Sequence, residues 1–235
     1  MSVLECERSL KSYLYSGKGG GKRRVLSDIL KELADHIPET VIFGGMPREF
    51  SLGNARGFSS DIDLVSLHDD LELERLTSKY LPVKNKFGGY RFSAGGWCFD
   101  LWSLKNTWAV KQGLVEASGF SDLLKTTFFD IDAVAFHISD KSLLCAELHR
   151  NAAERRVLGM NLKKNPQPAA MARRAINMAL MNGLALSREL ATYVSENIRE
   201  SRDDVVVQAV VSSIRRELKL RSDFIRPSVQ SDMWR

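Results

Sequence analysis

The stretch VIFGGMPREFSLGNARGFSSDIDLV (41–65) decides the fold of this chain. It opens with a β-branched, apolar run that ends at Gly44–Gly45, a pattern that predicts a buried strand entering a turn. It closes with Asp61 and Asp63 alternating with apolar residues, and this period of two predicts a second strand with both acids on one face. Between the strands, Arg48 lies in a short helical stretch. The whole segment predicts the core of a domain that combines a sheet with helices.

The composition is that of an ordinary globular protein. The chain has 235 residues, of which 44% are hydrophobic and 27% charged, and this excludes the disordered, collagen-like and fibrous classes. No apolar run approaches the roughly 18 residues that a membrane span needs. Glu5, Glu7 and Arg8 stand where a signal peptide would be apolar. Three scattered cysteines are too few for a disulfide framework or a zinc site. We therefore expect a cytoplasmic protein with no membrane partner.

The sequence pattern changes character near residue 146. Before it, helical and strand signals alternate; after it, the pattern is helical. Expected helices are 2–15, 23–36, 69–79, 146–157, 166–183, 187–199 and 203–219, with Asn182–Gly183 as a C-cap and Ser187 and Ser201 as N-caps. Expected strands are 40–45, 61–67, 83–87, 90–94, 97–104 and 128–138. This division predicts an α+β fold with two domains, 1–145 and 146–235, the first a mixed sheet of about five strands flanked by helices and the second a small all-helical domain.

The positive charge is concentrated in the last third of the chain. Residues 151–235 hold 15 Lys and Arg against 9 Asp and Glu, whereas residues 1–150 hold 19 against 20. A basic surface attracts polyanions by releasing counterions, although a solvated helical face has the same composition. If the partner is RNA, the cations expected to contact its phosphates are Arg215, Arg216, Lys219 and Arg221, all placed on the last helix.

The glycine-rich run GKGGGK (17–22) is not a phosphate loop. That motif requires GxxxxGK followed by Ser or Thr on a strand-to-helix turn. Here Arg23 follows the last lysine, the glycine spacing differs, and a helix precedes. We interpret the run as a flexible connector.

Three acids outline a candidate metal site. Asp61 and Asp63 would repel each other when both are ionised unless a cation lies between them. Asp100, in WCFDLWS, lies between large apolar residues, where an unpaired carboxylate is costly. Oxygen ligands of this kind select Mg²⁺ or Mn²⁺. A site for two-metal phosphoryl transfer requires such an arrangement, with two carboxylates on one strand and a third on a neighbouring strand. Gly44 and Gly45 would let backbone N–H groups approach a triphosphate.

These segments resemble the head domain of class II CCA-adding tRNA nucleotidyltransferases and bacterial poly(A) polymerases, in the DNA polymerase beta superfamily. The family pattern GGxVRDxLLGRxxxDIDLVT is similar to GGMPREFSLGNARGFSSDIDLVS, and IDVATFR is similar to CFDLWSL. RRDFTINALAY resembles TTFFDIDAVAF (126–136), and the helical neck DPLRILRAFRFAARLGF resembles NPQPAAMARRAINMALMNGLAL (165–186). The resemblance covers roughly residues 20–200 and implies a polymerase-beta-like head followed by a neck.

The resemblance implies a role for each matching residue. Asp61, Asp63 and Asp100 would hold the metal, and Asp100 would also assist deprotonation of the attacking hydroxyl. The residues implied in binding the nucleotide are Gly44, Gly45 and Arg48 at the triphosphate turn, together with Lys125, Asp132, Arg173 and Arg174. Both arginines of RRDFTINA are threonines here, so Lys125 would replace one lost charge, and Asp132 stands at the family's asparagine. Asp130 and Asp132 alternate, so from the residues alone they form either an exposed strand edge or part of a nucleotide pocket.

The sequence therefore predicts an enzyme, a nucleotidyltransferase that uses Mg²⁺ or Mn²⁺ to transfer NMP from an NTP to an RNA acceptor. A tRNA 3′ end is one such acceptor, and a toxin or defence effector with a protein partner or antitoxin is one biological setting. Two alternatives stay open. The first is nucleotidylation of a protein or small molecule, and the second is a non-catalytic, nucleotide- or RNA-binding relic of the fold.

Overall fold

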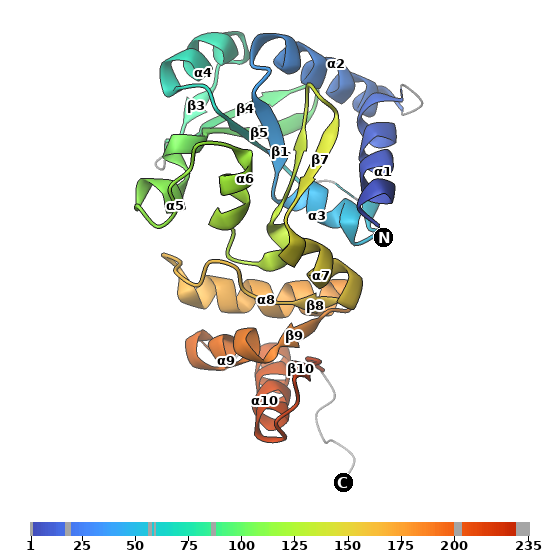
Figure 1. Ribbon diagram of the computed structural model, residues 1–235, viewed down its shortest axis with the longest axis vertical. Helices are drawn as coiled ribbons and strands as arrows, with labels where there is room; N and C mark the ends of the chain where they lie inside the picture. Colours follow the sequence, from blue (N-terminus) through green and yellow to red (C-terminus); the bar gives the residue numbers. More distant parts are fainter. Residues whose placement is uncertain are drawn as a thin grey trace. The chain divides into compact units, whose positions relative to one another are not determined.

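The computed structural model describes residues 2–16, 20–55, 58, 60–85, 88–199 and 204–228. The chain forms two compact units, Met1–Thr127 with Asp132–Arg150, and Phe128–Ile131 with Asn151–Arg235 (Figure 1). The second unit thus takes in a short segment from within the first as well as the last third of the chain. The two-domain boundary at 145/146 remains a prediction, because compactness alone does not define a folding domain.

A seven-stranded sheet forms the centre of the first unit, in the order β3-β4-β5-β2-β1-β6-β7. Strands β2 and β5 are parallel, and every other neighbouring pair is antiparallel, so the sheet is mixed as predicted, with seven strands where about five were expected. The strands are β1 (Thr40–Phe43), β2 (Ile62–Ser66), β3 (Val83–Lys84), β4 (Tyr90–Ala94), β5 (Trp97–Ser103), β6 (Val134–His137) and β7 (Ser142–Cys145).

Apolar side chains from both faces of this sheet are buried against helices or loops. On one face, a core cluster joins Leu64 and Phe99 to Leu10, Leu30 and Phe50. The other face carries a second cluster around Val41, Val65 and Leu123. The helices of this unit are α1 (Val3–Tyr15), α2 (Gly21–His36), α3 (Gly45–Ser51), α4 (Asp70–Thr77), α5 (Trp108–Lys111) and α6 (Phe120–Leu123), and α7 (Glu147–Arg155) begins in it. Alternation along each strand therefore separates two environments across one sheet.

The second unit is mainly helical. It contains α8 (Pro168–Asn182), α9 (Arg188–Asn197) and α10 (Val205–Lys219), whose buried residues form its core. Gly183 is left-handed and ends α8, and the Ser187 hydroxyl accepts a hydrogen bond from Leu190 N at the start of α9, so both predicted caps are confirmed. A small sheet, β10-β9-β8, adds β8 (Val157–Leu158), β9 (Ala185–Ser187) and β10 (Phe224–Ile225) to the predicted helices.

Two local predictions were wrong. The segment 128–138 is not one strand: Asp130–Asp132 forms a 3₁₀ turn, and only Val134–His137 is extended. Helix α10 is capped by the Asp204 carboxylate, which accepts a hydrogen bond from Val207 N. Ser201, the expected cap, lies outside the described residues, as do residues 17–19 of the glycine run. In the described part of the chain, no helix has the length and apolar character needed to cross a membrane.

Candidate active site

The glycine turn after β1 brings backbone against a carboxylate. Gly44 has φ +74°, in the left-handed region that glycine adopts without steric cost. A Cβ built there would lie 3.1 Å from Oδ2 of Asp63, so a side chain at this position would crowd the carboxylate. Phe43 is also the register partner of Asp63 in the β1–β2 ladder. The sequence order of strand, glycine turn and acidic strand therefore becomes a direct spatial contact.

The three predicted carboxylates meet at neighbouring strands. Asp63 of β2 and Asp100 of β5 are register partners in the parallel ladder, so their side chains leave the same face of the sheet side by side. Asp61 lies two residues earlier, immediately before β2 and not on the strand. The structure thus brings Asp63 and Asp100 side by side with Asp61 next to them in the chain, and their role in metal binding remains a prediction.

Arg91 lies between two of these acids, and the sequence analysis did not anticipate it. The guanidinium donates through Nη1 to Oδ2 of Asp100 at 3.2 Å and through Nη2 to Oδ2 of Asp61. Arg91 belongs to β4, where it is the register partner of Asp100 across the hairpin. The tight turn at Gly95–Gly96 fixes that register, because it pairs Ala94 with Trp97. Three residues further from the turn on each strand, Arg91 is paired with Asp100. The hairpin pattern could therefore have identified Arg91 from the sequence.

Asp100 has a perturbed carboxyl group. Burial raises the pKa of its carboxyl group; the Arg91 charge lowers that pKa, and the Asp61 charge raises it. Its Oδ1 atom is buried and has no hydrogen-bond partner among the described residues. A buried acceptor without a partner costs free energy. This oxygen atom is therefore an acceptor that a proton, a hydrogen-bond donor or a cation would stabilise.

The donor chemistry of this edge suits a divalent cation. All three side chains offer carboxylate oxygen, the ligand type that Mg²⁺ and Mn²⁺ prefer, and Oδ1 of Asp100 is an acceptor without a partner in the described chain. In the arrangement seen here, no three His, Cys, Asp or Glu side chains of the described residues converge on one metal position. The guanidinium of Arg91 instead supplies positive charge to Asp61 and Asp100.

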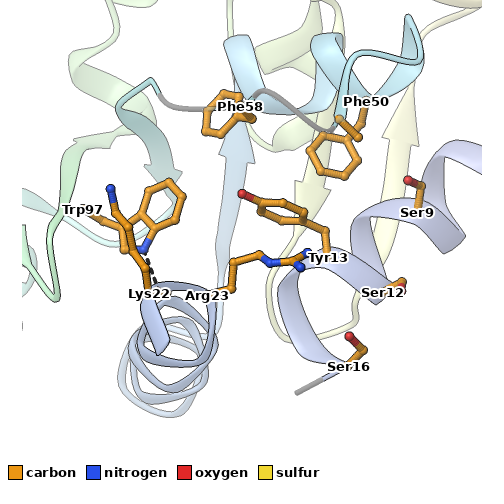
Figure 2. A pocket seen from close by; sticks show the side chains of 10 residues that line it. Ser9, Ser12, Tyr13, Ser16, Lys22, Arg23, Phe50, Phe58 and Trp97 are labelled. Carbon is orange, nitrogen blue, oxygen red and sulfur yellow. Dashed lines mark hydrogen bonds between the residues drawn. The ribbon is translucent and has the colours of Figure 1, made fainter. Parts of the chain in front are cut away.

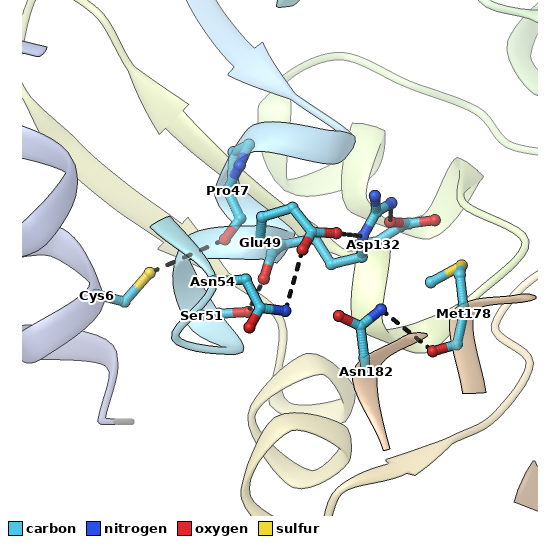
Figure 3. A network of polar contacts seen from close by, with 9 residues as sticks. Cys6, Pro47, Glu49, Ser51, Asn54, Asp132, Met178 and Asn182 are labelled. Carbon is cyan, nitrogen blue, oxygen red and sulfur yellow. Dashed lines mark hydrogen bonds and ion pairs between the residues drawn. The ribbon is translucent and has the colours of Figure 1, made fainter. Parts of the chain in front are cut away.

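Arg48, predicted to bind triphosphate, is engaged in a buried ion pair. Its Nη1 donates to Oδ1 of Asp132 at 2.7 Å, and its Nε donates to Oε1 of Glu49 at 3.0 Å. Glu49 also accepts from Asn54, so these groups form a network beside the glycine turn (Figure 3). Burial opposes the charge on Arg48, but the two carboxylates outweigh that effect and raise the pKa of the guanidinium.

The alternative of an exposed edge is wrong for Asp132. The residue is 8% exposed because the 3₁₀ turn directs its carboxylate to Arg48. Asp130, two residues earlier, belongs to the other unit, where its Oδ1 accepts from Gly159 N at 2.9 Å and from Ile131 N at 2.7 Å. A strand would have placed both acids on one face; the turn separates them. A role for Asp132 in nucleotide binding remains a prediction.

The remaining predicted residues are Lys125, which belongs to the first unit, and six cations of the second unit. Lys125 pairs with Asp122 at 2.8 Å, and this contact, with hydrogen bonds from Ser118, lowers the pKa of Asp122 to about 2. The second unit holds all the others: Arg173, Arg174, Arg215, Arg216, Lys219 and Arg221. All six are exposed, and Arg173 pairs with Asp204 at 2.6 Å. Arg221 is not on the last helix, since α10 ends at Lys219.

Comparisons with known proteins identify the fold. No family model matches the sequence, and no curated protein matches it. Among solved structures, the Thermotoga maritima CCA-adding enzyme in complex with tRNA matches with a TM-score of 0.60 at 17% identity, over 84% of this chain and 46% of that chain. The Bacillus stearothermophilus CCA-adding enzyme in complex with CTP matches with a TM-score of 0.55 at 15% identity, over 85% and 49%. A CCA-adding enzyme with ATP matches with a TM-score of 0.57 at 19% identity, over 88% and 46%.

These matches show that the chain has the fold of CCA-adding enzymes over the part of those chains that it covers. The chain spans about half the length of the solved chains it matches. The predicted α+β class is therefore confirmed, and so is the structural resemblance to class II CCA-adding enzymes. At 15–19% identity the likeness concerns the fold, not the activity.

Proposed function

We propose that the chain is a metal-dependent nucleotidyltransferase that transfers NMP from an NTP to an RNA acceptor, with a tRNA 3′ end as the leading candidate. The observation that carries the proposal is the meeting of three elements at one place. Gly44 backbone lies against Asp63, Asp63 of β2 lies beside Asp100 of β5, and Asp61 lies two residues before Asp63. In addition, the fold is that of enzymes whose solved complexes contain CTP, ATP or tRNA.

Each residue has a defined part in this proposal. Asp61, Asp63 and Asp100 would hold Mg²⁺ or Mn²⁺, which supplies the positive charge that stabilises the phosphoryl oxygens in the transition state. Gly44 and Gly45 leave room for the triphosphate beside Asp63. Oδ1 of Asp100 accepts the proton of the attacking hydroxyl, and burial suits it to this task because it raises the pKa toward that of an effective base. The hydroxyl oxygen then bonds to the α-phosphorus as the bond to pyrophosphate breaks.

RNA is favoured as the acceptor by the charge of the last third of the chain. Residues 151–235 carry a surplus of cations, and Arg215, Arg216 and Lys219 are exposed on α10. Each phosphate contact adds a similar, salt-dependent increment of affinity whatever the base sequence. Arg173 and Arg174, exposed on α8, are further candidates for contact with the nucleotide or the acceptor.

A second candidate, a non-catalytic relic of the fold, is favoured by two contacts. Arg91 already neutralises Asp61 and Asp100, and Arg48 is already bound to Asp132 and Glu49. Both contacts would have to open for metal and triphosphate to bind. The same arrangement also describes an enzyme at rest, so activity must decide.

The deciding experiment incubates the purified protein with each α-labelled NTP, total RNA, and Mg²⁺ or Mn²⁺. We expect label to enter RNA, and addition of EDTA to stop the transfer. Asp61→Ala/Asp63→Ala should be inactive, whereas the control Asp35→Ala, an exposed acid of α2, should be as active as the unmodified chain. Label found in the protein itself or in a small molecule would indicate that the acceptor is a protein or a small molecule and not RNA. Absence of transfer to any acceptor, with metal present, would favour the relic.

A further inference from the structure

A cavity of about 650 Å³ lies in the first unit, and the proposed reaction does not use it. Its walls come from α1, the start of α2, α3 and the loop that follows it, and the first residue of β5. The residues that line it are Ser9, Ser12, Tyr13, Ser16, Lys22, Arg23, Phe50, Ala55, Phe58 and Trp97. Figure 2 shows the serines along α1 on one side, Trp97 and Lys22 on the other, and Tyr13 and Arg23 between them. A volume of this size is within the range of small-molecule sites.

This cavity faces away from the candidate active site. Trp97, Phe99 and Leu101 point to the sheet face covered by the larger core cluster. Asp100 alternates with them and therefore points to the opposite face. An occupant of the cavity would not be a ligand of the three acids.

The cavity lining is cationic and contains no acid among the described residues. Lys22 Nζ lies 4.6 Å from the centre of the Trp97 ring, and Arg23 Cζ lies 4.9 Å from the centre of the Tyr13 ring. Neither cation pairs with a carboxylate in the described part of the chain. Lys22 and Arg23 also lie in the first turn of α2, which has no acidic residue. Cations there oppose the helix dipole, so an anion entering the cavity would relieve a local repulsion.

The rest of the lining suits a planar ring attached to that anion. Tyr13 and Phe58 supply partly exposed aromatic surface, and the buried Phe50 holds Tyr13 edge-on, with ring centres 5.1 Å apart. A base that stacks on an aromatic side chain gains affinity whatever its identity, because every base has a flat π-face. The hydroxyls of Ser9, Ser12 and Ser16 add hydrogen-bonding groups. Cations, hydroxyls and aromatic rings, with no acid among the described lining residues, suit a nucleotide.

We propose that this cavity is a second nucleotide site, which holds a base together with its phosphate, either as a free nucleotide or as one unit of an RNA strand. Its wall includes Phe50, Ala55 and Phe58, which lie on the segment between the glycine turn at Gly44 and the acid at Asp61. A ligand in the cavity would therefore contact the segment that connects Gly44 to Asp61. The proposal does not depend on catalysis, because the cavity and its charges exist without it.

The test is calorimetric titration of the full chain in EDTA with ATP, with a short oligouridylate, and with inorganic tripolyphosphate. We expect ATP or the oligonucleotide to bind at least about tenfold more tightly than tripolyphosphate, since only the first two can stack. Tighter binding of the oligonucleotide than of ATP would identify an RNA strand as the occupant; equal or weaker binding would identify a free nucleotide. Equal affinity for tripolyphosphate, or no saturable binding of either nucleotide probe, would overturn the proposal.

Variants assign that binding to the cavity. Arg23→Ala and Ser12→Glu should each weaken it at least about fivefold, because the first removes a cation and the second adds an anion. The matched control is Arg24→Ala, which removes the neighbouring cation of α2 outside the cavity and should leave affinity unchanged. An equal loss in Arg24→Ala would reveal binding to general positive charge and overturn the proposal. Asp61→Ala/Asp63→Ala should bind as well as the unmodified chain in EDTA, so this test and the activity test fail independently.

Discussion

The tripeptide Asp-Ile-Asp occurs twice in the chain, and the two copies have different structures. At 61–63 it leads into β2, and its acids lie beside Asp100 and Arg91. At 130–132 it forms a 3₁₀ turn, and its acids go to different units. The first copy brings its two acids close to other charged side chains, whereas the second copy directs its two acids to different partners. The comparison shows that the tripeptide alone does not determine the structure of an acidic pair; the residues that contact it do.

The largest expected effect separates the two copies by activity. If the proposed function is correct, Asp61→Asn should lower the rate of transfer by about three orders of magnitude, the upper end of what loss of one electrostatic group costs. Asp130→Asn should leave the rate within a few-fold, since Asp130 lies in the other unit and accepts hydrogen bonds from backbone N–H groups there. The measurement is single-turnover incorporation of labelled NMP. Equal losses in the two variants would contradict the assignment.

The second copy should instead control stability. Asp132→Ala leaves the Arg48 guanidinium buried without its closest carboxylate, and breaking a buried ion pair costs about 3–5 kcal/mol in the free energy of unfolding. Asp63→Ala should cost much less, because it removes one member of a group of like charges. Urea denaturation of both variants gives the comparison. A smaller loss in Asp132→Ala than in Asp63→Ala would show that the pair with Arg48 contributes little.

Arg91 allows the first copy to be examined without removing an acid. Arg91→Ala takes away the internal cation, so Mn²⁺ should bind the acids more tightly by a few-fold and raise the melting temperature more than in the unmodified chain. The control is Arg75→Ala, a cation of α4 with no contact to the three acids in the described structure. An unchanged Mn²⁺ response in Arg91→Ala would mean that Arg91 and the metal do not compete.

The smallest expected effect is a pH dependence that comes from Asp100. Because burial raises the pKa of this carboxyl group in the folded chain, the folded state binds the proton more tightly than the unfolded state. Stability contributed by protonated Asp100 is therefore present below its ordinary pKa and lost as the pH rises through the raised value. Asp100→Asn should melt about 1–3 °C higher than the unmodified chain at pH 7. The difference should vanish near pH 3, and a difference that persists there would point to packing instead.

Sequence reasoning reached the parts of the site whose signals are local. The glycine turn and the alternation of Asp61 and Asp63 are short-range patterns, and the structure places both as predicted. Asp100 could be predicted because WCFDLWS alternates clearly. An alternating pattern indicates by itself that a segment is a strand and which of its residues share a face.

The missed features depend on partners distant in the chain. Asp132 reads as a strand residue until Arg48, 84 positions earlier, provides an ion pair that holds the turn. The second unit reads as all-helical because its strands are two or three residues long, too short for a period to show. The cavity joins α1, α2 and the loop after α3, and no local pattern reports such a juxtaposition.

The segment Phe128–Ile131 limits how this protein can be divided. The chain passes between its units three times, so no single cut separates them. A fragment ending at residue 150 would retain Phe128 and Phe129 but lack Tyr193, whose ring lies 5.1 Å from that of Phe128. It would also lack Gly159, whose N–H bonds to Asp130, and at which a Cβ would lie 2.5 Å from Oδ2 of that same side chain. A cut at residue 150 would therefore leave each fragment without contacts that the second unit makes in the whole chain.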